Sequence, residues 1–193
     1  MKKLLLALLA VACGTAYAQA PKLIRGTIAG LEGDVLSVKA RDGKDLKIRL
    51  APDAAVVVPK ETTLAEFKPG SYVGVTSLRR PDGRLLAKRV HALGPAVPSG
   101  HMDWDSIPHS KMTNANIAGI VQVSGGNELT LKYKDGEQKI LVDHDTKYYT
   151  FAPASRADLK PGATIFTGAK MEGEGRYSTG RVVVSKDGIA PPQ

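Results

Sequence analysis

Cysteine is almost missing from this sequence, since Cys13 is the only one among 193 residues. It lies in an N-terminal segment that begins Met1-Lys2-Lys3, continues as an apolar run over residues 4–12 and reaches Ala16-Tyr17-Ala18. These three parts, in this order, are typical of a secretory signal peptide. We therefore predict a signal peptide over residues 1–18, cleaved near Ala18. The mature chain then has no cysteine, which excludes disulfides, thiolate metal sites and thiol chemistry.

The position of Cys13 leaves one alternative open. The preceding residues, Leu9-Ala10-Val11-Ala12, loosely resemble the lipobox at which bacterial lipoproteins are cut and acylated, although leucine is usual where Ala10 stands. In that case Cys13 would carry a lipid anchor. The Ala16-Tyr17-Ala18 pattern is the better match, so we expect a periplasmic or secreted protein.

Long hydrophobic runs and catalytic motifs are also missing. A spanning helix needs roughly 20 apolar residues, and no segment comes near that length, so we expect no transmembrane segment. The chain has no Gly-x-Ser-x-Gly, no His-Glu-x-x-His, no phosphate-cradling glycine loop and no Cys-x-x-Cys. Asp143-His144-Asp145 has the composition of a general base with carboxylates, but neighbours in a strand point to opposite faces. We predict that the protein is not an enzyme and holds no catalytic residues.

What the sequence does contain is an internal duplication. Residues 23–94 align with 117–187 at an offset of 93 that falls to 92 midway. The matches are mainly glycines and turn residues. They are Gly26 with Gly119, Asp42-Gly43 with Asp135-Gly136, Lys68-Pro69-Gly70 with Lys160-Pro161-Gly162, and Arg89-Val90 with Arg181-Val182. We therefore predict two repeats, 23–94 and 117–187, joined by a linker over 95–116.

Each repeat alternates apolar and polar residues with a period of two, which indicates β-strands. The Asp-Gly pair in each copy predicts a hairpin turn. Short helical turns are expected near residues 62–67 and 155–159, each with a Thr or Ser placed to cap free amides. Five strands with a helical turn before the fourth predict an all-β fold of two tandem small OB-like barrels.

The mature chain is basic. Without Lys2 and Lys3 it carries 25 Lys and Arg against 19 Asp and Glu, a formal charge of +6. Such a surface favours anionic partners. Nucleic acid is not expected, because the protein is predicted to be exported. A solvated basic surface with no specific partner is the plainer interpretation.

The linker holds an unusual set of residue types, including the only tryptophan and two of the four methionines. Thioether sulfur and imidazole nitrogen suit Cu(I) or Ag(I), and an indole face beside the ion adds cation–π attraction. The candidate metal ligands and neighbours are His101, Met102, Trp104, His109 and Met112. The alternative is that Met102, Trp104 and Ile107 pack the linker against a barrel.

This set resembles the periplasmic copper and silver metallochaperones, small OB-type barrels that bind Cu(I) through one His and two Met beside a Trp. The resemblance implies a periplasmic soft-metal carrier. It rests on composition alone, since that family's ligands lie on strands within one barrel whereas these lie between two repeats.

The turns and closing strands resemble a family of exported bacterial domains of unknown function. Its pattern is a Gly-x-Val-like opening, an Asp-Gly hairpin, a Leu-Lys-Pro-Gly-like turn and an Arg-Val strand, and it appears here from Gly26 to Val90 and from Gly119 to Val182. The resemblance implies OB-like barrels and export, without an activity. The leading expectation is therefore a non-catalytic binding or scaffolding module for a protein or an anionic envelope component.

Overall fold

The computed structural model describes residues 21–192, so the predicted signal peptide, with Cys13 and the Ala18 cleavage site, lies outside the described residues. Within them the regular structure is twelve strands and two 3-10 turns, η1 (Leu64–Glu66) and η2 (Arg156–Asp158), so the all-β class is confirmed. The strands are β1 (Lys22–Glu32), β2 (Val35–Ala40), β3 (Asp45–Thr62), β4 (Tyr72–Arg79), β5 (Leu85–Ala92), β6 (Gly100–Trp104), β7 (Ser110–Val123), β8 (Gly126–Tyr133), β9 (Gly136–Val142), β10 (Lys147–Ala154), β11 (Thr164–Gly173) and β12 (Arg176–Val184).

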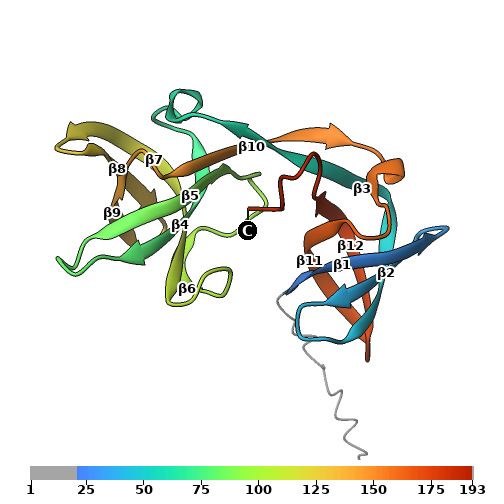
Figure 1. Ribbon diagram of the computed structural model, residues 1–193. Helices are drawn as coiled ribbons and strands as arrows, with labels where there is room; N and C mark the ends of the chain where they lie inside the picture. The colour runs from blue at the N-terminus through green and yellow to red at the C-terminus, as the bar shows by residue number, and fades with distance from the viewer. Residues whose placement is uncertain (1–20, 193) are drawn as a thin grey trace, which may run out of the picture.

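Five strands close into one barrel, called barrel A, at the right of Figure 1. Around it, β1 pairs with β2, β2 with β3, β3 with β12, β12 with β11, and β11 with β1 again. The β3–β12 pair is parallel, with Tyr177 beside Ile48, and the other pairs are antiparallel. A closed five-stranded barrel agrees with the predicted OB-like fold.

A second closed ring of five strands, called barrel B, lies at the left of Figure 1. Its order is β7, β8, β9, β5, β4 and back to β7. The β5–β9 pair is again parallel, with Leu85 beside Ile140 and Leu86 beside Leu141. The two barrels therefore have the same strand order.

Neither barrel corresponds to one repeat, which differs from the predicted tandem arrangement. Barrel A takes its three-stranded meander from the repeat 23–94 but its closing hairpin, β11–β12, from the repeat 117–187. Barrel B combines the meander of the second repeat with β4–β5 of the first. The predicted boundaries mark the duplication in the sequence, whereas the strand pairing exchanges the closing hairpins.

The physical reason is the length of β3. The extended, β-branched run Val56-Val57-Val58 continues β3 beyond the meander instead of folding back. Its second half pairs antiparallel with β10, from Val56 opposite Ala154 to Thr62 opposite Tyr148. Figure 1 shows this two-stranded connection passing between the barrels. Because β3 delivers the chain to barrel B, β4 and β5 close that barrel.

Both hydrophobic cores depend on both repeats. The most deeply buried side chains of barrel A include Leu36, Ile48, Leu50, Val182 and Val184. Those of barrel B include Val73, Val75, Val90, Leu129 and Leu131. Burying each side chain of this kind contributes about 1.5–3 kcal/mol. A repeat on its own would therefore lose about half of each core.

The segment 95–116 is more regular than its sequence indicates. Residues 100–104 form β6, which pairs antiparallel with the first half of β7. Residues 110–116 belong to β7, and those from Lys111 to Asn116 also pair with β4. The sequence shows no sustained alternation here because β7 lies between two strands and buries consecutive side chains.

The two helical turns are present, but one predicted cap is wrong. Thr63 stands at the N-cap of η1, and its hydroxyl makes no capping hydrogen bond. At η2 the Ser155 N–H donates to the carboxylate of Asp158 at 2.9 Å. The Lys68-Pro69-Gly70 turn and its repeat equivalent follow these elements, as predicted, with both glycines at positive φ.

Candidate functional site

Arg25 of barrel A lies at a contact with the β6–β7 segment of barrel B. It lies on β1 of barrel A directly across from Phe166, and its guanidinium is 5.0 Å from the Phe166 ring centroid. The ring centroid of Trp104, at the end of β6, lies 4.9 Å from the same guanidinium. The carboxylate of Asp105 forms an ion pair with it at 2.8 Å. Burial lowers the pKa of Arg25, and the charge of Asp105 opposes that effect.

The β6–β7 segment thus bridges from barrel B to barrel A. A second arginine strengthens the bridge, because the Arg41 guanidinium donates to the main-chain carbonyl oxygen of Asp105 at 2.6 Å. Trp104 and Asp105 belong to the predicted linker, while Arg25 and Arg41 belong to the first repeat. This is the second connection between the barrels, after the β3–β10 pair.

The structure brings together only part of the predicted metal set. Met102 and Met112 are direct cross-strand partners, with Met112 buried and Met102 37% exposed. His101 pairs with Thr113 at the neighbouring register position, so it projects from the opposite face, and its Nδ1 lies 2.8 Å from the Thr113 hydroxyl.

The remaining members of that set lie apart from the methionine pair. His109 is exposed in the β6–β7 loop with φ 60°. Trp104 stacks on Arg25. In residues 21–192, no three His, Cys, Asp or Glu side chains lie close enough together to hold a metal ion. The soft-metal site stays a prediction that the Met102–Met112 pair alone favours.

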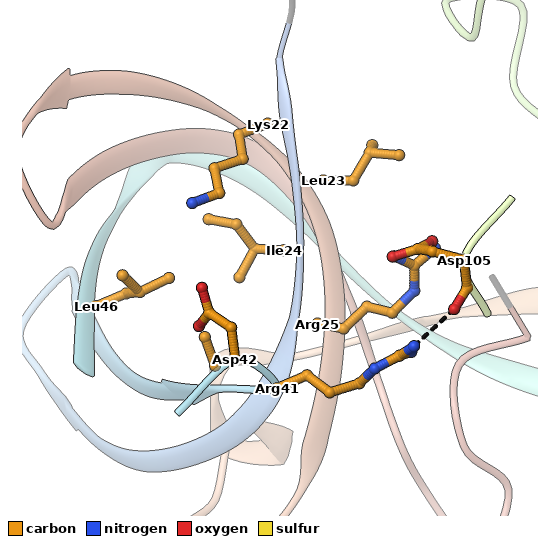
Figure 2. Close-up of a pocket in the computed structure, with 9 residues that line it drawn as sticks. Lys22, Leu23, Ile24, Arg25, Arg41, Asp42, Leu46 and Asp105 are labelled. Carbon is orange, nitrogen blue, oxygen red and sulfur yellow. Dashed lines mark hydrogen bonds and ion pairs between the residues drawn. The ribbon is translucent and has the colours of Figure 1, made fainter. Parts of the chain in front are cut away.

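A pocket of about 310 Å³ lies at one end of barrel A, beside the Arg25 contact (Figure 2). Its apolar lining comes from buried Ile24 and Leu46, with Leu23 and Ala40. Its polar lining consists of Lys22, Arg25, Arg41, Asp42 and Asp105. This size lies at the lower end of the range for small-molecule sites.

Sequence reasoning missed these pocket residues, although comparison of the repeats contains a signal. Ala40 of barrel A aligns with Tyr133 of barrel B, and Leu46 aligns with Gln138. In barrel B the amide of Gln138 donates to the Tyr133 hydroxyl at 3.4 Å. The Tyr133 ring also lies 3.2–3.3 Å from where a Cβ on Gly136 would stand, so it covers the hairpin turn. A tyrosine therefore occupies the position that a small alanine leaves open in barrel A.

A second depression, of about 570 Å³, crosses the outer face of barrel A over β11, β12 and β3. Lys170, Ser178 and Arg49 form one cross-strand row along it. The aligned row in barrel B is Leu78, Leu86 and Leu141, paired in the same register. The row is basic and largely exposed on barrel A, whereas on barrel B it is apolar, with Leu141 buried and the other two leucines partly buried.

The aromatic residues of β10 serve both barrels. Tyr148 packs on Phe67 of core B with ring centroids 6.1 Å apart. Phe151 lies edge-on to His91 at 6.3 Å and beneath the Arg181 guanidinium at 5.2 Å. Burial, followed by the charges of Arg89 and Arg181, lowers the pKa of His91 to about 3. His91 is therefore a neutral packed side chain at physiological pH.

The Asp143-His144-Asp145 trio forms a turn. The Asp143 carboxylate accepts hydrogen bonds from the Asp145 N–H at 3.0 Å and from the Thr146 hydroxyl at 3.3 Å. His144 lies 3.4 Å from Asp145, and both side chains are mostly exposed. These bonds satisfy polar groups of a turn between β9 and β10.

No protein family, curated protein or solved structure matches this chain. Within residues 21–192, no helix is long and apolar enough to cross a membrane.

Proposed function

We propose that this protein is an exported, non-catalytic binding module that holds an anionic component of the cell envelope on the outer face of barrel A. The observation that carries the proposal is the unequal division of charge between two barrels of the same topology. The segments that build barrel A, 21–58 and 155–192, contain 13 Lys and Arg against 9 Asp and Glu. The segment 63–146, which builds barrel B, contains 10 against 9.

The basic residues of barrel A also lie where a partner can reach them. Arg49 keeps 67% of its side chain exposed despite its 3.6 Å ion pair with Asp34. Lys170 is exposed in the same cross-strand row. An exposed ion pair of this kind contributes little and is readily exchanged for another anion. A polyanionic surface gains contacts with both cations at once.

The test is cosedimentation of the mature protein with vesicles of phosphatidylglycerol mixed with phosphatidylcholine, and with vesicles of phosphatidylcholine alone. We expect binding only to the anionic vesicles and weakening by added salt. Each Lys or Arg near such a surface contributes about 1 kcal/mol. The double variant Arg49→Gln, Lys170→Gln should therefore bind about 30-fold more weakly.

The matched control is Lys132→Gln, Lys139→Gln in barrel B. Both lysines are about two-thirds exposed and each lies 3.8 Å from a glutamate, so the change in net charge is the same. Equal loss in the two double variants, or no binding to anionic vesicles, overturns the proposal. Binding to an acidic protein in place of vesicles would move the partner to another class.

A second candidate function, soft-metal carriage, is favoured by the Met102–Met112 pair. A Cu(I) titration under anaerobic conditions, followed by Trp104 fluorescence, tests it. We expect saturable quenching near one equivalent that Met102→Ala abolishes. Met171→Ala is the control, because Met171 is 49% exposed on β11, far from β6 in the strand order. Quenching that is indifferent to Met102 contradicts this candidate.

A further inference from the structure

The pocket at the end of barrel A is lined by three cationic side chains and two carboxylates, so its net charge is positive. Arg25 forms its ion pair with Asp105. The other two cations, Lys22 and Arg41, have no carboxylate within ion-pairing distance in the described part of the chain. Lys22 donates to the Tyr177 hydroxyl at 3.3 Å, and Arg41 donates to a main-chain carbonyl.

The second carboxylate of the pocket is already engaged. Asp42 accepts a hydrogen bond from the Lys44 N–H at 3.2 Å and lies 3.4 Å from the Lys44 ammonium. The backbone hydrogen bond from Lys44 is the largest cause that lowers the pKa of Asp42, and the charge of Lys22 contributes to the same shift. Asp42 therefore stays ionised and bound to its own turn.

Figure 2 shows Lys22 above and Arg41 below Ile24 and Leu46, with the Arg41 guanidinium turned toward Asp105. An ammonium and a guanidinium that bond only neutral oxygens gain more from an anion, since charge-assisted hydrogen bonds are roughly twice as strong as neutral ones. The planar guanidinium of Arg41 matches a carboxylate or a phosphate in shape.

We propose that this pocket binds a small ligand through a carboxylate or phosphate group held between Lys22 and Arg41. The apolar part of the ligand lies on Ile24 and Leu46. This site is separate from the outer-face row of Lys170 and Arg49, because the two depressions share no lining residue. The inference therefore goes beyond the proposed function and does not rest on it.

Asp105 limits the affinity of the site. Its carboxylate comes from the β6–β7 loop and already satisfies Arg25 at the pocket wall. Replacing it with the neutral isostere in Asp105→Asn removes a negative charge from the pocket wall, which favours an anionic ligand. The expected result is severalfold tighter binding, which a merely structural role of Asp105 does not produce.

The experiment is calorimetric titration of the mature protein with two probes, inorganic phosphate and hexanoate. Saturable binding of either at one site supports the proposal, and the probe that binds identifies the anionic group. Ala40→Tyr gives barrel A the residue that barrel B has at the aligned position, Tyr133. Because barrel B has the same strand order and accommodates this ring, we expect the variant to fold with its pocket filled. Ala40→Tyr and Arg41→Gln should each lower the affinity at least tenfold.

The control is Lys134→Gln, which removes the cation aligned with Arg41 from the end of barrel B that Tyr133 covers. We expect no change. No saturable binding of either probe, or equal losses in Arg41→Gln and Lys134→Gln, overturns the inference. Measuring vesicle binding as well distinguishes a failure of this inference from a failure of the proposed function. Ala40→Tyr should leave vesicle binding intact. Arg49→Gln, Lys170→Gln should leave small-anion binding intact.

Discussion

Barrels A and B share most of their meander core residues and differ more on their surfaces. Leu36 and Leu129 hold the same place in the two meanders, and both are completely buried. Outside, Arg49 of barrel A aligns with Leu141 of barrel B, and at the barrel end Ala40 aligns with Tyr133. The inward residues stay alike because close packing tolerates few changes. The residues that differ between the copies are therefore the best guide to a binding site.

A second difference is an exchange of side-chain size between strands. In barrel A a large Phe166 faces Val183 across β11 and β12. In barrel B the aligned pair is Gly74 and His91. A Cβ on Gly74 would lie 2.5 Å from the His91 ring. The larger side chain of the pair is on β11 in barrel A and on β5, the equivalent of β12, in barrel B. The two barrels therefore fill this place from opposite strands.

The largest expected effect tests whether the barrels are independent. Leu36→Ala in core A and Leu129→Ala in core B should each destabilise the protein by about 2–5 kcal/mol, as deletions in close-packed cores do. Because each core contains strands of both repeats, we expect one unfolding transition that shifts as a whole in either variant. Differential scanning calorimetry measures it. Two transitions, each moved by only one variant, would show that the barrels unfold separately.

The next effect sharpens the size exchange. Gly74→Ala should cost about 1–3 kcal/mol, the usual cost of overpacking a filled interior. Adding His91→Val, which copies the small residue of barrel A, should recover most of that loss. Urea denaturation of the two single variants and the double variant gives the coupling. Additive losses would mean that Gly74 and His91 do not constrain each other.

The buried His91 of barrel B should make the stability of the whole protein depend on pH. The pKa of His91 is about 3 in the folded protein, below the unfolded value of about 6.5. The unfolded state binds the extra proton between these values, so stability is complete above pH 6.5 and falls with decreasing pH, by at most ~1.4 kcal/mol per pH unit. His91→Val should remove this contribution from the pH profile of urea unfolding. An unchanged dependence of the free energy of unfolding on pH in this variant would contradict the role given to His91. The aligned residue of barrel A, Val183, has no titratable group.

The smallest effect concerns the contact between the barrels. The ion-pair part of the Arg25→Ala change should cost about 1 kcal/mol, because the Asp105 side is 68% exposed and exposed pairs are weak. Loss of the Arg25 side chain, which is only 12% exposed, from between Trp104 and Phe166 adds a packing cost. The loss of this contact should be seen more clearly in the fluorescence of Trp104 than in the free energy of unfolding. Loss of the guanidinium from the indole face should make Trp104 fluorescence more accessible to acrylamide quenching. Arg49→Ala, an equal charge change elsewhere on barrel A, should leave the quenching unchanged.

The candidate site was predictable only in part. The linker residues were recognised as unusual by composition, and the structure gives Trp104 a role at the contact between the barrels. Lys22 and Arg41, by contrast, carry no motif. They meet because the start of β1 and the hairpin after β2 lie at the same end of barrel A. Asp105 reaches Arg41 from a position 64 residues further along the chain.

Local sequence patterns predicted the meander strands, the closing hairpins, the Asp-Gly turns and the duplication, but not β6 or the β3–β10 pair. Alternation of apolar residues and the Asp-Gly pairs are local signals, and each repeat carries them independently. Only the tertiary structure decided which hairpin closes which barrel. Because the repeats are alike, β11–β12 and β4–β5 offer similar partners to either meander, so local pattern cannot choose between them. The long β3, paired with β10, decides the choice by carrying the chain out of barrel A before the hairpin can return.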